Sequence, residues 1–150
     1  MCFGSIGMVI GCDLLDIEPV PGAILFPYSD FTSQVTQSKI IEASKEVRSR
    51  FDVILSDMAP NASGQRNLDQ DRIIALSYSV FRFALLNSNL KANFVTKVWN
   101  GPKVDNLLKD MEKFYDEVER VKPNSSRKES GELYLVGRGF KGIKKHHNIT

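Results

Sequence analysis

The sequence feature that most constrains the fold of this chain is a short apolar run that ends at an acidic residue. Residues 51–56 read Phe-Asp-Val-Ile-Leu-Ser, and Asp57 then opens a loop that contains Pro60 and Asn61. Short runs of Val, Ile and Leu are typical of strands in a buried parallel sheet. Ligands of such sheets bind beyond the carboxyl ends of the strands, where Asp57 would lie. For a single Asp, the simpler interpretation is a polar turn that solvates its own carboxylate.

Length and composition describe an ordinary globular domain. The chain has 150 residues, of which 42% are hydrophobic and 25% are charged. Its longest apolar runs fall far short of the roughly 20 residues that a membrane-spanning helix needs. We therefore expect one folded domain with no membrane partner.

Positive charge is concentrated near the C-terminus. The net charge is only +2, but residues 120–147 contain eight Lys and Arg against two Glu. This distribution favours a polyanionic partner such as a nucleic acid. For the basic C-terminal tail, residues 141–150, a solvated segment is an equally good interpretation. Its two histidines, His146 and His147, form no recognisable metal site.

The hydrophobic pattern alternates between strand and helix periods. Strands are expected at 7–12, 23–26, 51–56, 92–99, 119–122 and 131–136, and helices at 33–50, 68–86 and 104–118,. Strands that alternate with helices predict a doubly wound α/β domain. The short link over 122–131 predicts that the last two strands form an antiparallel hairpin.

Three ionisable residues occupy positions that apolar packing does not explain. Asp57 follows one predicted strand, Lys97 lies inside another, and Glu132 lies in the last. Burial of an unpaired charge costs several kcal/mol. The two acidic residues and the lysine would avoid this cost as partners of one another if they met at one edge of the sheet. A catalytic group and a purely structural ion-pair cluster both fit the pattern.

Four sequence blocks occur together and in order: IGCDLLDIEPVPGA at 10–23, DMAPN at 57–61, FVTKVWNG at 94–101 and KPNSSRKESGELYLV at 122–136. They resemble the FtsJ-like ribosomal RNA 2′-O-ribose methyltransferases. The resemblance covers roughly residues 7–140, so residues 1–140 are expected to be a partial domain of this family. It implies a Rossmann-like methyltransferase sheet, mostly parallel, with a C-terminal antiparallel hairpin. It also implies S-adenosyl-L-methionine as the cofactor.

The same resemblance assigns roles to the three ionisable residues. Asp57, Lys97 and Glu132 match three members of the family's Lys-Asp-Lys-Glu catalytic set, with Lys97 as the expected base. The residue types suit the chemistry, because a ribose 2′-hydroxyl is a poor nucleophile until its proton is removed. An amine accepts that proton only when it is neutral, whereas nearby carboxylates favour the ammonium form. Asp57 and Glu132 would therefore chiefly orient the lysines.

Binding residues are carried over in the same way. Asp13, Asp30 and Asp57 resemble the family's contacts to S-adenosylmethionine. RNA, expected to be ribosomal RNA of the large subunit, would approach Lys122, Ser125, Ser126, Arg127 and Lys128,. The resemblance further implies a monomer located in the mitochondrion, with the cytoplasm and the nucleus as alternatives.

Two family features do not occur in these 150 residues. The family has a Gly-rich loop after its first strand and a first catalytic lysine before it, and neither is present. We therefore expect an N-terminally truncated chain that lacks the family's first strand and is less stable than a complete domain. A non-catalytic RNA-binding or ribosome-assembly protein is the alternative function. A nucleotide-binding oxidoreductase has less support, because no GxGxxG motif occurs.

Overall fold

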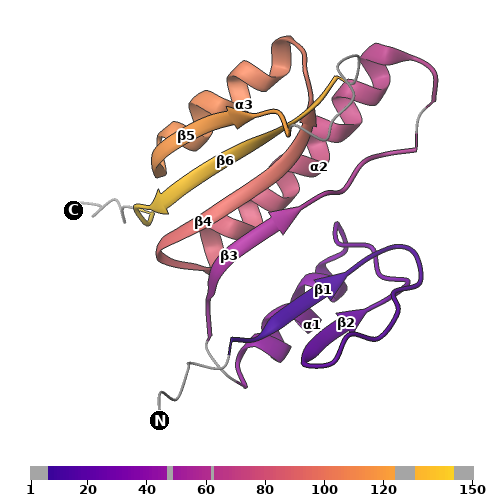
Figure 1. Cartoon of the computed structure of the whole chain (residues 1–150), viewed down its shortest axis with the longest axis vertical. Helices are drawn as coiled ribbons and strands as arrows, with labels where there is room; N and C mark the ends of the chain where they lie inside the picture. Colours follow the sequence, from indigo (N-terminus) through magenta and orange to yellow (C-terminus); the bar gives the residue numbers. More distant parts are fainter. Residues whose placement is uncertain (1–6, 47–48, 62, 124–130, 144–150) are drawn as a thin grey trace, which may run out of the picture. The chain divides into compact units, whose positions relative to one another are not determined.

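The computed structural model describes residues 7–46, 49–61, 63–123 and 131–143. The chain divides into two compact units, residues 1–50 and residues 51–150 (Figure 1). The strands accordingly form two sheets, one of two strands and one of four. None of the helices among the described residues is long and apolar enough to cross a bilayer.

The N-terminal unit consists of two parallel strands and a helix. Strands β1 (Val9–Cys12) and β2 (Ala23–Phe26) pair in parallel, and helix α1 spans Gln34–Ser44. The loop after β1 is bonded to the segment after β2, because the Ser29 amide donates to the Asp13 carbonyl at 2.8 Å. The carboxyl ends of both strands therefore open into neighbouring loops.

The C-terminal unit contains a four-stranded sheet with two helices. Its elements are β3 (Phe51–Ser56), α2 (Arg66–Asn87), β4 (Ser88–Trp99), α3 (Pro102–Glu112), β5 (Tyr115–Val121) and β6 (Glu132–Phe140). The strand order is β3-β4-β6-β5. Strands β3 and β4 are parallel, and β6 is antiparallel to both β4 and β5. The expected α/β class and the closing antiparallel hairpin are confirmed.

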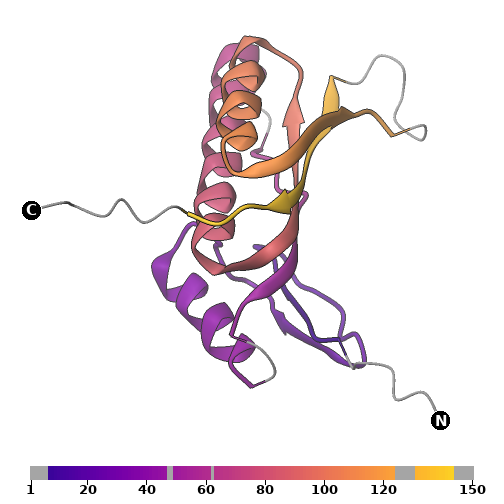
Figure 2. The same cartoon turned by 90° about the vertical axis from the view of Figure 1, so that its left-hand side faces the viewer.

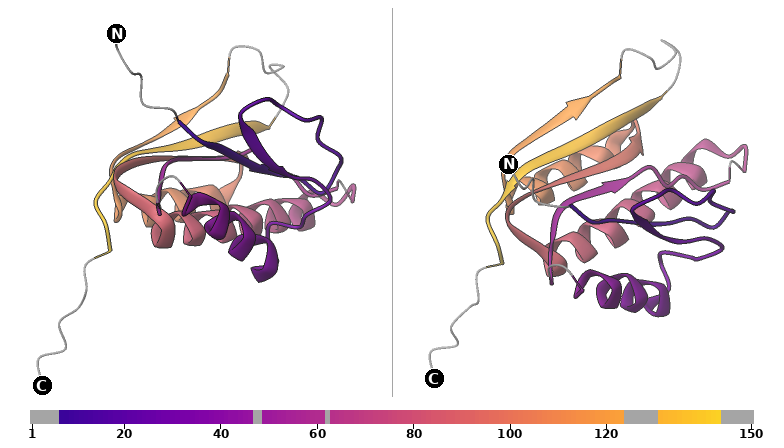
Figure 3. Two further views of the ribbon diagram at one scale, coloured as in Figure 1. Left: turned by 90° about the horizontal axis from the view of Figure 1, so that it is seen from below. Right: turned by 60° about the horizontal axis from the view of Figure 1, so that its bottom comes forward.

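Both helices of this unit lie on the same face of the sheet (Figures 2 and 3). The strand β4 turns alternate residues, among them Phe94 and Val98, toward this face, and both are fully buried,. The opposite face has no helix among the described residues of the unit. There Val53 and Leu55 remain 52% and 72% exposed. We call this surface the open face.

Several element boundaries differ from the sequence prediction. The helix expected over 104–118 ends at Glu112, and β5 begins at Tyr115 rather than at residue 119. Phe114 and Tyr115 continue the helical spacing of apolar residues, but Tyr115 is a buried strand residue that packs on Phe140, with ring centroids 5.6 Å apart. Tertiary packing overrides the local period here. For the same reason β6 extends past residue 136 to Phe140, which pairs with Tyr115.

Candidate active site

Asp57 and Lys97 meet at the carboxyl ends of two parallel strands. Strand β3 ends at Ser56, which is paired with Thr96 of β4, so the next residue of each strand lies at the same edge of the sheet. Lys97 Nζ lies 2.9 Å from Asp57 Oδ1. The Lys97 side chain is 13% exposed and that of Asp57 is 73% exposed. The pair is therefore open to solvent from the side of the carboxylate.

The strand alternation of β4 explains how a lysine is accommodated there. Thr96 and Val98 point toward the helices and are buried, so Lys97 between them points toward the open face,. The lysine was expected inside a buried strand, but its side chain does not enter the apolar core. Its amine keeps Asp57 as a partner and its side chain is only partly buried, which avoids most of the cost of charge burial,.

Tyr134 completes the arrangement and was not predicted from the sequence. It lies directly opposite Lys97 in the antiparallel β4–β6 pair, and its hydroxyl donates to Asp57 Oδ1 at 2.8 Å. The same carboxylate oxygen therefore holds both Lys97 and Tyr134. The spacing from Glu132 could have indicated this residue. Tyr134 lies two residues after Glu132, so both side chains share one face of β6.

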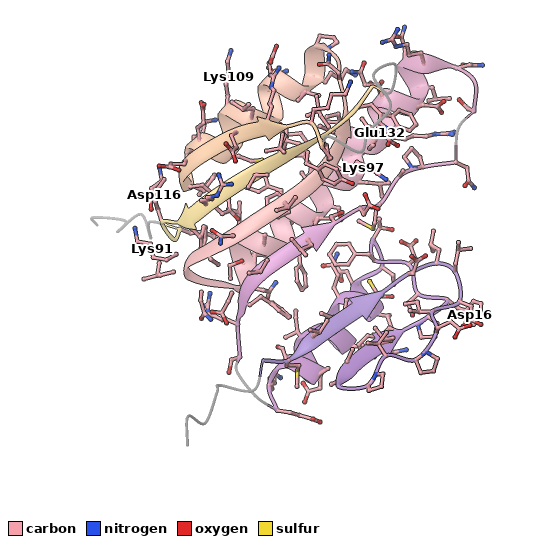
Figure 4. All side chains as sticks on the ribbon, in the orientation of Figure 1. Asp16, Lys91, Lys97, Lys109, Asp116 and Glu132 are labelled. Atoms are coloured by element: carbon pink, nitrogen blue, oxygen red, sulfur yellow. The ribbon has the colours of Figure 1, made fainter. Side chains whose placement is uncertain are left out.

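Glu132 lies at the same end of the sheet. It is paired with Trp99, two residues along the strand from the Lys97–Tyr134 pair, so it is a diagonal neighbour of Lys97 (Figure 4),. The structure thus brings the three predicted residues, Asp57, Lys97 and Glu132, to one edge of one sheet. Their catalytic roles stay predictions.

The hydrogen bonds set the protonation states of the carboxylate and the phenol. Partial burial alone would raise the pKa of Asp57, but the hydrogen bonds from Lys97 and Tyr134 outweigh it and place the pKa below the ordinary value of 3.8,. The hydrogen bond to Asp57, together with burial, raises the pKa of Tyr134. At neutral pH Asp57 is therefore an acceptor and Tyr134 a neutral donor.

A buried hydroxyl pair fixes the backbone of β4 below the site. The Ser77 hydroxyl of α2 lies 3.2 Å from the Lys97 carbonyl oxygen and 2.9 Å from that of Ile73, and it accepts a hydrogen bond from Thr96 Oγ1 at 3.2 Å. Ser77 and Thr96 are 2% and 1% exposed. Helix α2 therefore restrains the backbone of β4 at Lys97 through the hydrogen bonds of Ser77.

The loop that follows Asp57 is anchored to the first turn of α2. Asp69 is only 4% exposed. Its two carboxylate oxygens accept hydrogen bonds from the Ser63 amide at 2.9 Å and 3.0 Å. The next residue, Gly64, has φ +80°, a conformation that L side chains rarely adopt,. The loop beside the site is therefore held by a specific backbone contact.

This anchor predicts a loss of stability in acid. Hydrogen bonds from the Ser63 hydroxyl and amide lower the pKa of Asp69 below 3.8, against the opposing effect of burial. Because the folded pKa is depressed, the carboxylate stabilises the fold above pH 3.8, and this contribution is lost as the pH falls through the folded value,. We expect Asp69→Asn to be less stable than the wild type near about pH 6, with a difference that shrinks toward about pH 2.

The measurement is the free energy of unfolding by denaturant at several pH values in that range. Asp69→Asn keeps the size of the side chain, so the comparison isolates the charge. A difference between the two proteins that stays constant across the whole pH range would contradict the prediction.

The two other predicted cofactor residues lie in the N-terminal unit. Asp13 follows β1 and accepts the Leu15 amide at 2.9 Å, whereas Asp30, after β2, accepts the amide and hydroxyl of Thr32 at 2.8 Å and 2.7 Å. In each case the acceptor is Oδ1. The second oxygen of each carboxylate accepts no hydrogen bond from the described part of the chain.

The predicted RNA contacts are described only in part. Lys122 directly follows β5 and is exposed. Ser125, Ser126, Arg127 and Lys128 lie outside the described residues, as do residues 144–150 of the basic tail. Lys141, at the start of that tail, donates through Nζ to the Glu112 carbonyl at 3.0 Å.

The chain is similar to known proteins along most of its length. The family model of the FtsJ-like methyltransferases matches residues 2–140. The chain is 48% identical to rRNA methyltransferase 2, mitochondrial, of Drosophila melanogaster over 91% of this chain and 54% of that protein. It is 42% identical to Ribosomal RNA large subunit methyltransferase E of Magnetococcus marinus over 93% of this chain and 64% of that protein.

A solved structure shares the fold. A Plasmodium falciparum protein, classed as a ribosomal RNA methyltransferase, aligns with a TM-score of 0.77 at 24% identity, over 90% of this chain and 73% of that one. The chain spans a little over half to about two thirds of the length of the two curated relatives. From the family model and the identities to these relatives, the chain belongs to the FtsJ-like methyltransferase family.

Proposed function

We propose that this chain carries the catalytic residues of an S-adenosylmethionine-dependent methyltransferase that modifies the 2′-hydroxyl of a ribose in ribosomal RNA. The observation that carries the proposal is the Lys97–Asp57 pair, 2.9 Å apart at the carboxyl ends of two parallel strands. An amine held by a carboxylate at an accessible sheet edge can receive a proton from a hydroxyl group placed beside it. Tyr134 and Glu132 flank this pair.

Each residue has a distinct task in this reaction. Lys97, in its neutral form, accepts the proton of the 2′-hydroxyl as the oxygen attacks a methyl group. Asp57 orients the Lys97 amine, and Tyr134 fixes the Asp57 carboxylate through the same oxygen. Such positioning lowers the entropic barrier of bringing an oxygen and a methyl group into line. The cofactor, when bound, supplies a methyl group already activated by its sulfonium.

The residues after β1 and β2 suit the nucleoside part of such a cofactor. Ribose hydroxyls and adenine amines are hydrogen-bond donors, and carboxylates after parallel strands are the acceptors that commonly bind them. Asp13 and Asp30 each use Oδ1 for a local turn, which leaves Oδ2 as an acceptor toward a ligand. We assign the nucleoside to these two residues and the methionine end to Asp57.

The relatives suggest the RNA and the compartment. One is named a mitochondrial rRNA methyltransferase and the other a methyltransferase of the large ribosomal subunit. We therefore propose large-subunit ribosomal RNA as the substrate and the mitochondrion as the location. The exposed Lys122 and the basic residues that follow it supply phosphate contacts that carry no sequence information,.

The test measures methyl transfer and its chemical position. The protein is incubated with methyl-labelled S-adenosylmethionine and a large-subunit RNA transcript. We expect label in the RNA at a single ribose, and the phosphodiester that follows this ribose then resists alkaline cleavage, because a 2′-O-methyl group removes the attacking hydroxyl. A transcript with a 2′-deoxynucleotide at that position should accept no label.

Two outcomes would overturn the proposal. Label on a base rather than on the ribose would show a different reaction. RNA binding without cofactor binding or transfer would favour the non-catalytic RNA-binding alternative. Isothermal titration with S-adenosylmethionine separates a failure to bind cofactor from a failure of the chemistry.

A further inference from the structure

Trp99 is an aromatic residue that lies on the same strand and the same face of the sheet as Lys97. It is the last residue of β4, two positions after Lys97, so both side chains project from the open face of the sheet,. On the helix side of the sheet, the aromatic residues Phe94 and Tyr115 are fully buried in the core. Trp99 is instead only partly buried.

The Trp99 side chain has no specific partner in the described part of the protein. Ring contacts link Phe94, Tyr115 and Phe140 to one another, whereas no described ring stacks on Trp99. Its indole N–H donates to no described protein group. A large residue that was needed only for packing would be expected to be covered as fully as Val98, its neighbour in the strand, which is 0% exposed.

We propose that Trp99 is the stacking surface for the base of the nucleotide whose ribose is methylated, an inference that rests on the proposed function. Residues two apart in a strand are separated by about 7 Å. A nucleotide with its ribose at Lys97 can therefore reach Trp99 with its own base. Glu132, opposite Trp99 on β6, is the carboxylate nearest to that position by register.

The physical chemistry of RNA supports a stacking platform at this place. A 2′-hydroxyl that must approach a side chain and a methyl donor is accessible only when its nucleotide is splayed out of a helix. Unstacking costs free energy, and an aromatic side chain that stacks on the exposed base recovers part of it. Stacking tolerates any base because every base has a π-face, so Trp99 would position the nucleotide without selecting it.

Intrinsic fluorescence tests this directly, because Trp99 is the only tryptophan in the 150 residues. In a titration of the 150-residue chain with a short single-stranded RNA that contains the target, we expect quenching that saturates with RNA binding. Trp99→Leu should weaken RNA binding by about tenfold to a hundredfold and raise the KM for RNA, whereas Trp99→Phe should restore most of the affinity. The affinity for S-adenosylmethionine should not change.

An RNA that lacks only the target base gives the decisive comparison. Loss of that base should weaken binding to the wild type and have little further effect on Trp99→Leu, because the stacking contact is already gone. An equal loss for both proteins would overturn the proposal, as would an unquenched fluorescence at saturating RNA. Circular dichroism of both variants identifies a folding defect, and Trp99→Phe tests the stacking contact if the leucine variant does not fold.

The same experiment distinguishes this proposal from the proposed function. Fluorescence quenching requires RNA binding but no methyl transfer, so it can be followed with Lys97→Ala, in which transfer is expected to be lost. Quenching that depends on the target base, in a wild-type protein that transfers no methyl group, would leave the stacking site intact and overturn only the proposed reaction. Transfer that is unaffected in Trp99→Leu at low RNA concentration would overturn only the stacking site.

Discussion

Lys97→Ala is expected to lower the rate of methyl transfer by about a hundredfold to ten-thousandfold, the usual contribution of a general base. The variant should stay folded, because the Lys97 side chain projects from the open face and not into the core. The affinity for RNA and for S-adenosylmethionine should change little, since the lost step is proton transfer. Single-turnover transfer rates, measured together with both affinities and the free energy of unfolding, check this expectation.

Lys97→Arg separates a base from a fixed positive charge. An arginine keeps the cation beside Asp57 but does not release a proton at neutral pH, so it cannot act as a base. We expect this variant to be as inactive as Lys97→Ala. Full activity of Lys97→Arg would show that only the charge matters, and unchanged transfer by Lys97→Ala would remove Lys97 from the mechanism.

A matched control exists on the same strand. Lys91 of β4 forms an ion pair with Asp116 at 2.8 Å, at the other end of the sheet from Lys97 and Glu132 (Figure 4). Its side chain is 75% exposed. Lys91→Ala removes the same chemical group and one ion pair from β4. We expect a transfer rate within about twofold of the wild type, because the pair lies away from the site and exposed ion pairs contribute little to stability,.

The main elements of the site could be predicted because charges in strands are unusual. Asp57 and Lys97 stood out against apolar neighbours, and parallel strands necessarily bring such residues to one edge of a sheet,. Tyr134 did not stand out, since a tyrosine fits any strand pattern. Its role depends on the β4–β6 register, which pairs it with Lys97, and register is set by tertiary contacts that a single sequence does not reveal,.

The loop anchor and the start of β5 were missed for related reasons. Asp69 looks like an ordinary acidic residue in the first turn of a helix, and only the folded loop shows that it accepts the Ser63 amide,. The apolar residues around Tyr115 continue a helical period for one more turn. They become a strand because Tyr115 packs between Phe94 and Phe140 in the core.

Tyr115 also explains why residue 137 must be small. Gly137 lies in the middle of β6, paired with Phe94 on one side and Val118 on the other. A Cβ atom added there would lie 2.8 Å from Cγ of Tyr115. Tyr115 is 1% exposed and its ring contacts those of Phe81, Phe94 and Phe140, so it has no free space to move into,.

Gly137→Ala is therefore expected to lower the free energy of unfolding by about 3 kcal/mol, at the upper end of the usual cost of overpacking a core. Gly131→Ala is the matched control, because a Cβ atom there meets no atom of the described residues within 4 Å. It should change stability by less than about 1 kcal/mol, and it can even stabilise the fold by restricting the unfolded chain. Denaturant unfolding of the two variants beside the wild type measures both effects.

A second substitution at Tyr115 tests whether the tyrosine ring causes the loss of stability in Gly137→Ala. Tyr115→Leu alone should destabilise the protein, because it removes part of a buried aromatic cluster,. If the added methyl group acts through the ring, the double variant Gly137→Ala with Tyr115→Leu should lose less stability than the two single variants together. Strictly additive losses would mean that Gly137 is required for a reason other than the tyrosine ring, and a Gly137→Ala protein as stable as the wild type would mean that this part of the core can rearrange.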